Sequence, residues 1–352
     1  MRPAENRCTG SPPFRAHLAT LGCLTHDVHA GSQGKEIVRD ARRTRDRLLG
    51  RGVTLCAVAI GAGLLIAGTP RVTRAAAPDS IRTSASAKVD EDSLRGRSGK
   101  LRAVLVPRSE RRAGILERLF GDSLLHTPGV HEVPDTTGRL GLAVITMRDF
   151  AEKLGGKIGA YRIGFWPAER RKLLSTAYAN PEGFIEVTPE NADTHVSEHF
   201  MLRDFLTHDQ EGVWPKYLVL RAPLVDKLEL VISQLEARGT PVRRMSVMSG
   251  FRTPQYNARA GERGGRSKVS RHMYGDAADV FVDNDGDGRM DDLNRDGRID
   301  YRDAKVILDA VEQVERMHGD LVGGVGVYRS TRSHGPFAHV DVRGNRARWG
   351  RL

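Results

Sequence analysis

Apolar positions in the last third of the chain recur with the periods of helices and strands. The spacing predicts a helix from Leu224 to Arg238 that ends at Gly239, with one apolar face made of residues 224, 228, 231, 232 and 235. Residues 304–317 predict a second helix, whose inward side chains are Ile307, Leu308, Val311 and Val314. Residues 241–248 predict a buried strand between the two helices.

Residues 337–342 predict a strand whose two faces differ in chemistry. Alternate side chains of a strand point to opposite faces. One face therefore carries Phe337, His339 and Asp341, and the other carries apolar residues at 338, 340 and 342. The polar side chains of this strand are thus expected to point toward one site.

An earlier region, residues 101–195, predicts a small α+β unit. Its expected elements are strands at 101–106, 161–166 and 183–188 and a helix from Ser109 to about Phe120. The residues indicate no chemistry here, so packing against the following domain is favoured over a role in binding. Residues 78–100 are rich in Ser, Arg, Asp and Lys, which is typical of a linker.

The first 77 residues predict an export signal. A basic stretch at 42–51 precedes an uncharged apolar run at 52–68, and small residues follow at Ala75–Ala77. This order is typical of a secretory signal peptide. The apolar run is shorter than the roughly 20 residues of a spanning helix, so cleavage is favoured over the alternative, an uncleaved membrane anchor.

The net charge of +11 does not indicate nucleic-acid binding, because it is unevenly distributed. Residues 1–77 carry 12 Lys and Arg against 5 Asp and Glu, which leaves +4 for the rest of the chain. The sequence contains no basic stripe interleaved with aromatic residues. Cys8, Cys23 and Cys56 all precede Ala77, so the cleaved chain has no disulfide and no thiolate ligand.

The segment Ser-Arg-His-Met-Tyr-Gly-Asp-Ala-Ala-Asp at 270–279 carries a metal-binding pattern. His272 and Asp279 are seven positions apart with small residues between them, so both side chains can turn toward one point. Imidazole and carboxylate ligands suit first-row metals, and zinc is the usual occupant. His339 is the candidate for the third ligand. Two histidines, one carboxylate and an open fourth position are the ligand set of a hydrolytic zinc site.

Four sequence blocks occur in order along the second half of the chain. They are Ser-Gly-Phe-Arg-Thr-Pro at 249–254 followed by Tyr256–Asn257, the 270–279 segment, Gly-Gly-Val-Gly-Val-Tyr at 323–328, and Phe-Ala-His-Val-Asp at 337–341. Together they resemble the zinc D-Ala-D-Ala carboxypeptidase family, and within it the murein endopeptidase K type. The resemblance extends from about His199 to the C-terminus.

This resemblance implies an α+β domain at 196–352 with the hedgehog/DD-peptidase fold, in which helices flank an antiparallel sheet. It implies cleavage of peptide stems in the bacterial cell wall, and zinc ligands at His272, Asp279 and His339. The family's better-known members carry a Glu or His two or three residues before the last zinc ligand as catalytic base. This chain has Phe337 and Pro336 at those positions, so the base is left open.

Three side chains are candidates for the catalytic work around the zinc ion. Asp341 either orients His339 or handles protons. His334 is the other candidate base, with an ordinary loop histidine as the alternative. Arg252 either forks onto a substrate carboxylate or carbonyl group or forms a structural salt bridge.

Two overlapping acidic loops follow Asp279 and predict calcium binding. Residues 283–292 have acids at EF-hand positions 1, 3, 5 and 9, and residues 292–303 repeat the pattern. Gly288 and Gly297 occupy the turn position of each loop. Such dense negative charge repels itself without a cation, but an acidic solvated surface is the alternative, and the overlap leaves open whether both loops fill. The candidate ligands are Asp283, Asp285, Asp287, Asp291, Asp292, Asn294, Asp296, Asp300 and Asp303.

The predicted function is zinc-dependent hydrolysis of peptidoglycan stem or cross-link peptides by a metal-activated water. The alternative is a non-catalytic cell-wall-binding module, favoured by the missing Glu or His before His339. A cytoplasmic nucleic-acid protein is disfavoured by the charge distribution. The expected cofactors are Zn²⁺ and Ca²⁺, and the expected partners are peptidoglycan peptides, outside the cytoplasmic membrane in the periplasm or cell envelope. Membrane contact is expected only if the N-terminal segment is not cleaved.

Overall fold

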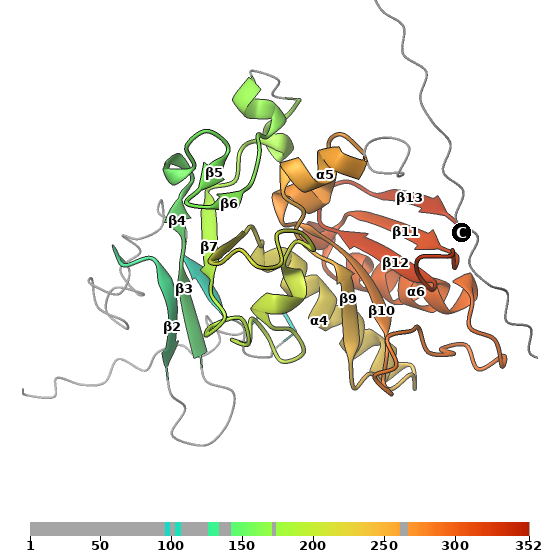
Figure 1. Ribbon diagram of the computed structural model, residues 1–352. Helices are drawn as coiled ribbons and strands as arrows, with labels where there is room; N and C mark the ends of the chain where they lie inside the picture. The colour runs from blue at the N-terminus through green and yellow to red at the C-terminus, as the bar shows by residue number, and fades with distance from the viewer. Residues whose placement is uncertain are drawn as a thin grey trace, which may run out of the picture. The chain divides into compact units, whose positions relative to one another are not determined.

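A computed structural model describes residues 96–98, 103–106, 126–133, 142–170, 174–260 and 267–351 (Figure 1). The predicted signal or anchor at 52–68, the small residues at 75–77, most of the predicted linker and the predicted helix at 109–120 lie outside these residues. All described residues belong to the contact unit Asp79–Leu352. No described helix is long and apolar enough to cross a membrane.

A three-stranded sheet begins the described chain. Its strands are ordered β1-β3-β2, with β1 parallel and β2 antiparallel to β3. The bounds are Val104–Val106 for β1, Gly129–Val133 for β2 and Leu142–Thr146 for β3. The strand predicted at 101–106 is therefore confirmed in its second half.

Short strands connect this sheet to the domain that follows. β4 (Arg148–Asp149), β7 (Gly183–Val187) and β8 (Lys216–Leu218) form a second sheet in the order β4-β7-β8. The strand predicted at 183–188 is confirmed by β7. Short 3-10 helices at Phe150–Glu152 (η2), Pro167–Arg170 (η3) and Thr176–Tyr178 (η4) complete this part.

The strand predicted at 161–166 is wrong beyond its first two residues. β5 (Lys157–Ile158) and β6 (Tyr161–Arg162) form a small hairpin, after which the chain leaves the ladder. The reason is Gly164, whose φ of 87° turns the backbone. Trp166 then enters the interior, where its Nε1 donates to the Met273 carbonyl at 2.8 Å.

The largest sheet has five strands in the order β13-β11-β12-β10-β9 (Figure 1). Neighbouring strands are antiparallel, except that β13 runs parallel to β11. The strand predicted at 241–248 begins only at residue 245. The bounds are Met245–Ser249 for β9, Ala277–Val282 for β10, Gly324–Tyr328 for β11, Phe337–Asp341 for β12 and Ala347–Gly350 for β13.

Both predicted helices of this domain are present. α4 covers Ala222–Ala237, and α6 covers Tyr301–Met317. α6 begins three residues before the predicted start because Asp300 caps it, its carboxylate accepting the Arg302 backbone N–H at 2.8 Å. α6 packs against β11 and β12, and α4 packs against α6. The remaining helices are η5 (Leu202–Phe205), α5 (Pro254–Ala260), η7 (Arg271–Tyr274) and η8 (Gly319–Leu321).

The apolar face predicted for α4 is buried, and the burial extends beyond that face. Asp226, Lys227 and Glu229 are buried along with the apolar side chains of this helix. Two of them are buried because partners neutralise them: Lys227 pairs with Glu315 at 2.8 Å, and Glu229 pairs with His199 at 2.8 Å. The predicted α+β class is confirmed, with small sheets preceding a mostly antiparallel sheet and its helices.

Candidate metal centre

One row of residues crosses the five-stranded sheet and builds the site. The register places His339 of β12 opposite Asp279 of β10 on one side and opposite Gly326 of β11 on the other. The row continues to Ser249 of β9 and to Trp349 of β13. Residues directly opposite one another in neighbouring strands project from the same face of a sheet. Four segments that are far apart in the sequence therefore present their side chains together.

His272 reaches this row from η7. Gly275 ends η7 with a φ of 67° and turns the chain into β10. A Cβ at Gly275 would collide with the backbone of Val219 and Leu220, so a glycine is needed there for space as well as for conformation. This turn explains how residues seven positions apart, His272 and Asp279, converge.

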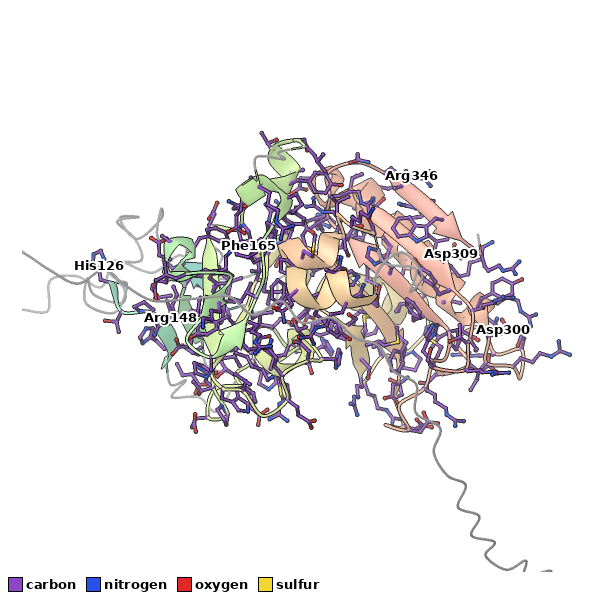
Figure 2. The ribbon with its side chains drawn as sticks, turned by 45° about the horizontal axis from the view of Figure 1, so that its top comes forward. His126, Arg148, Phe165, Asp300, Asp309 and Arg346 are labelled. Atoms are coloured by element: carbon purple, nitrogen blue, oxygen red, sulfur yellow. The ribbon has the colours of Figure 1, made fainter. Side chains whose placement is uncertain are left out.

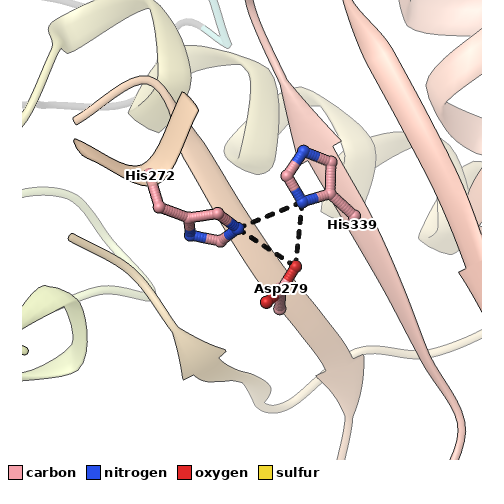
Figure 3. Close-up of side chains that lie close together, drawn as sticks. All are labelled: His272, Asp279 and His339. Carbon is pink, nitrogen blue, oxygen red and sulfur yellow. Dashed lines mark hydrogen bonds and ion pairs between the residues drawn. The ribbon is translucent and has the colours of Figure 1, made fainter. Parts of the chain in front are cut away.

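Three side-chain atoms meet at one point (Figure 3). His272 Nε2 lies 3.1 Å from His339 Nδ1 and 3.3 Å from Asp279 Oδ1, and His339 Nδ1 lies 2.9 Å from the same oxygen. Ligands bound to a tetrahedral metal at about 2.0–2.1 Å lie about 3.3–3.4 Å apart. The triangle is therefore only slightly smaller than that of a zinc site.

The outer nitrogen of each imidazole, which points away from the meeting point, is hydrogen-bonded in a way that suits metal binding by the inner nitrogen. His272 Nδ1 lies 2.7 Å from the Gly250 carbonyl, so this nitrogen carries the proton and donates it. His339 Nε2 lies 3.0 Å from Asp341 Oδ2, so the same holds there. Both histidines then turn a lone pair toward the carboxylate of Asp279. Three atoms with lone pairs facing one another can hold a cation between them, and the donor set fits zinc.

Burial and charge act on these groups in opposite directions. Burial lowers the pKa of His272, which favours the neutral, metal-binding imidazole. Burial acts to raise the pKa of Asp279, but His272 and His339 hold that pKa well below its usual range. Burial also opposes charge on His339, yet the carboxylates of Asp279 and Asp341 raise its pKa, so a metal ion that binds at Nδ1 displaces a proton from the imidazole. The carboxylate is therefore charged and available as a ligand.

Arg252 contacts the site through Asp279. Its Nη2 donates to Asp279 Oδ2, and its Nε donates to Ser249 Oγ at 2.8 Å. The guanidinium thus holds one oxygen of the carboxylate and leaves Oδ1 facing the two histidines. Of the two roles expected for Arg252, the structure contains the salt bridge.

Asp341 lies behind His339. Its side chain is fully buried and accepts the Gly324 N–H at 2.7 Å as well as the guanidinium of Arg343. Burial acts to raise the pKa of Asp341, but hydrogen bonds from His339 and Arg343 hold it far below its usual range. A carboxylate enclosed in this way orients the imidazole and keeps its charge.

His334 is not brought to the three ligands by any interaction found among the described residues. Its Nδ1 lies 2.8 Å from the Gly335 carbonyl, and its ring packs edge-on against Phe337 at 5.0 Å between centroids. These contacts are those of a loop histidine.

An aromatic pair beside the centre was missed by the sequence reasoning. The Trp349 ring lies 5.1 Å from the His339 ring, and its Nε1 donates to the Tyr328 hydroxyl at 2.7 Å. The indole crosses the sheet over Gly326, where a Cβ would collide with it. Gly324 likewise leaves room for the Asp341 carboxylate and for Trp349. The signal was present in Gly324 and Gly326, which alternate with valine along β11.

The region at 101–195 supports the segment that carries His272. Arg271 donates to the Ala177 carbonyl at 2.6 Å, and Trp166 donates to Met273. A cavity of about 530 Å³ adjoins this contact, lined by β1, residues 176–183 and the start of α4. The cavity does not include the three candidate ligands. These contacts agree with the packing role favoured for the region.

The structure places the candidate calcium ligands from Asp283 to Asp300 in irregular chain between β10 and α6, and Asp303 in the first turn of α6. It brings Asp283, Asp285 and Asp287 together, with carboxylate oxygens within 4.8 Å of one another. The other candidates make hydrogen bonds within the segment: Asp291 accepts the Asn284 N–H at 3.0 Å, and Asn294 accepts the Asp296 N–H at 2.9 Å.

Comparison with known proteins adds little to this geometry. No protein-family model matches the chain, and no curated protein matches it. Among solved structures, the Serratia marcescens L-Ala D-Glu endopeptidase ChiX is similar to 35% of this chain over 82% of its own length. The sequence identity is 23% and the TM-score is 0.25.

Proposed function

We propose that the protein is a zinc-dependent peptidase. The observation that carries this proposal is the convergence of His272 Nε2, Asp279 Oδ1 and His339 Nδ1 at one point. The other ring nitrogen or carboxylate oxygen of each group is hydrogen-bonded, so that a lone pair of each ligand atom faces inward. A zinc ion held there would polarise an amide carbonyl and lower the pKa of a bound water to about 7.

The chain's own residues position the ligands for that chemistry. Arg252 and Ser249 fix the Asp279 carboxylate, the Gly250 carbonyl fixes His272, and Asp341 fixes His339. Each contact restrains a ring or carboxylate from behind, so little reorganisation is needed when a substrate binds. Asp341 and Arg252 are assigned here as positioning residues.

We propose peptidoglycan stem or cross-link peptides as the substrate, with the protein exported to the periplasm or cell envelope. The four sequence blocks support this choice, because they surround the three ligands and the glycine-rich strand beside them. The alternative, a wall-binding module without activity, is favoured by the absence of a Glu or His at positions 336 and 337.

Digestion of purified sacculi tests the proposal. The zinc-loaded protein should release defined peptide fragments, identified by mass spectrometry, and His272→Ala and His339→Ala should each abolish release. Asp309→Asn, an exposed change on α6, serves as the matched control with native activity. Binding of sacculi without release of fragments would favour the wall-binding module, and full activity in either histidine variant would refute the zinc centre.

We propose the acidic segment at 283–303 as a second and separate metal site for Ca²⁺.

A further inference from the structure

The acidic segment divides into two turns with different hydrogen bonding. In the second turn, residues 292–303, the carboxylates are already satisfied. Asp303 accepts three backbone N–H groups, and Asp296 and Asp300 form ion pairs with Arg302. This turn is held together by its own groups.

The first turn gathers three carboxylates, and the Arg244 guanidinium lies beside it at Gly286. Oxygens of Asp283, Asp285 and Asp287 lie within 4.8 Å of one another. Within the part of the chain that the structure describes, no ion pair involves any of the three. Negative charges this close repel one another strongly unless a cation lies between them.

Asp283 supplies an independent observation. The residue is only 1% exposed, and its Oδ1 is buried without a hydrogen-bond partner among the described residues. Its Oδ2 accepts the Ser246 hydroxyl at 3.2 Å. A buried carboxylate oxygen without a partner is unfavourable, and a bound cation removes that cost.

We propose that the first turn binds one calcium ion through Asp283, Asp285 and Asp287. Carboxylate oxygens are the ligands of this hard cation, whereas zinc prefers nitrogen and sulfur. Gly286 and Gly288 have φ angles of 77° and 79°, which let the backbone curl so that alternate acids face inward. The site is separate from the histidine centre and does not depend on hydrolysis there.

The ion fixes one end of the β9–β10 strand pair, which also carries the candidate zinc ligand Asp279. The Asp283 N–H donates to the Arg244 carbonyl at 3.0 Å, and Asn284 accepts the Arg243 N–H at 2.6 Å. Asp279 lies four residues before Asp283 on β10. Calcium therefore stabilises the pairing of β9 with β10.

Calcium titration of the full-length, zinc-saturated protein tests the site. A hundredfold excess of calcium over its Kd should raise the Tm by roughly 5–10 °C. Asp285→Asn and Asp287→Asn alter exposed side chains of unchanged size, so the fold is expected to persist. Each should lower calcium affinity at least tenfold, as measured by calorimetry, and remove most of the Tm shift. Asp309→Asn should bind calcium like the native protein.

Asp300→Asn distinguishes the two turns (Figure 2). Loss of calcium binding in Asp300→Asn, with full binding in Asp285→Asn and Asp287→Asn, would place the ion in the second turn and overturn the proposal. An unchanged Tm of the native protein with calcium would do the same. Amide hydrogen exchange over 244–249 and 279–283 should slow when calcium is added, and unchanged exchange there would refute the effect on β9 and β10. None of these readouts requires peptidase activity.

Discussion

His339 and Asp341 lie two residues apart on β12, and a hydrogen bond of 3.0 Å joins Nε2 of the imidazole to Oδ2 of the carboxylate. The carboxylate therefore lies on the side of the ring opposite to Asp279. It also accepts the Gly324 N–H and the guanidinium of Arg343. This arrangement favours orientation of a metal ligand over proton transfer at the open side of the centre.

Asp341→Asn should weaken zinc binding more than it slows catalysis. Asn keeps the size of the side chain but removes the charge that holds the tautomer of His339, so zinc affinity should fall about 10–100-fold. Most of the activity should return at saturating zinc. Competition with a chromophoric chelator measures affinity, and the rate is measured at excess zinc. A loss of about 10²–10⁴-fold at saturating zinc would instead identify Asp341 as the general base.

His334→Ala should leave the pH–rate profile unchanged. The described contacts of His334 are with Gly335 and Phe337, and none is with the three ligands. A general base contributes about 10²–10⁴-fold to the rate, so its removal is easily detected. Disappearance of the acidic limb of the profile, with the rate reduced by that amount, would make His334 the base.

Gly326→Ala should perturb the centre without changing any ligand. A Cβ at position 326 meets the indole of Trp349, which lies beside His339 and contacts Tyr328. Displacement of the indole is expected to lower the zinc affinity. It should also lower the free energy of unfolding by about 1–3 kcal/mol. Gly335→Ala is the matched control, because nothing lies within 4 Å of its added Cβ. Equal zinc affinity in the two variants would show that Trp349 does not support His339.

The pairing of His199 with Glu229 should make stability depend on pH. Burial acts to raise the pKa of Glu229, but hydrogen bonds from the side chain and the backbone N–H of His199 lower it below 4.5. A depressed carboxyl pKa contributes stability above the unfolded pKa of about 4.5, and this contribution is lost as the pH falls through the folded pKa. The unfolding free energies of the native protein and of Glu229→Gln, measured with urea, should therefore differ at pH 6–7 and converge toward pH 3. A constant difference over this range would contradict the assignment.

Local periodicity explains which features could be predicted from the sequence. The alternating pattern along 337–341 correctly placed His339 and Asp341 on one face, because successive side chains of a strand point to opposite faces. The register that sets Asp279 opposite His339, and the path of Trp349 over Gly326, join distant segments. No local pattern specifies such pairings.

The polar positions of α4 show the same limit. The spacing of apolar residues predicted the buried face made of residues 224, 228, 231, 232 and 235, but it did not predict that Lys227 and Glu229 are buried as well. Charged residues are rarely buried unless they are paired. The partners of Lys227 and Glu229 are Glu315 and His199, which lie 88 and 30 residues away in the sequence. The burial of the two charged residues follows from those pairings and not from the spacing of the helix.

Lys227 is expected to stabilise both the fold and the metal centre. Its side chain is fully buried, and Nζ donates to Glu315 and to the backbone carbonyl of Asp341, at 2.8 Å each. Removing one partner of a buried ion pair costs about 3–5 kcal/mol when the other charge is left uncompensated. Glu315 keeps Arg348 and the Gly323 N–H as partners, so Lys227→Met should lower the unfolding free energy by less than that amount.

Lys227→Met should also weaken zinc binding, because the Asp341 backbone loses the donor that anchors it behind His339. Lys157→Met, at an exposed position of β5, controls for the loss of a lysine charge. Urea unfolding measures the effect on stability, and zinc titration measures the effect on the metal centre. Native zinc affinity in a folded Lys227→Met protein would separate the buried pair from the metal centre and limit Lys227 to a structural role.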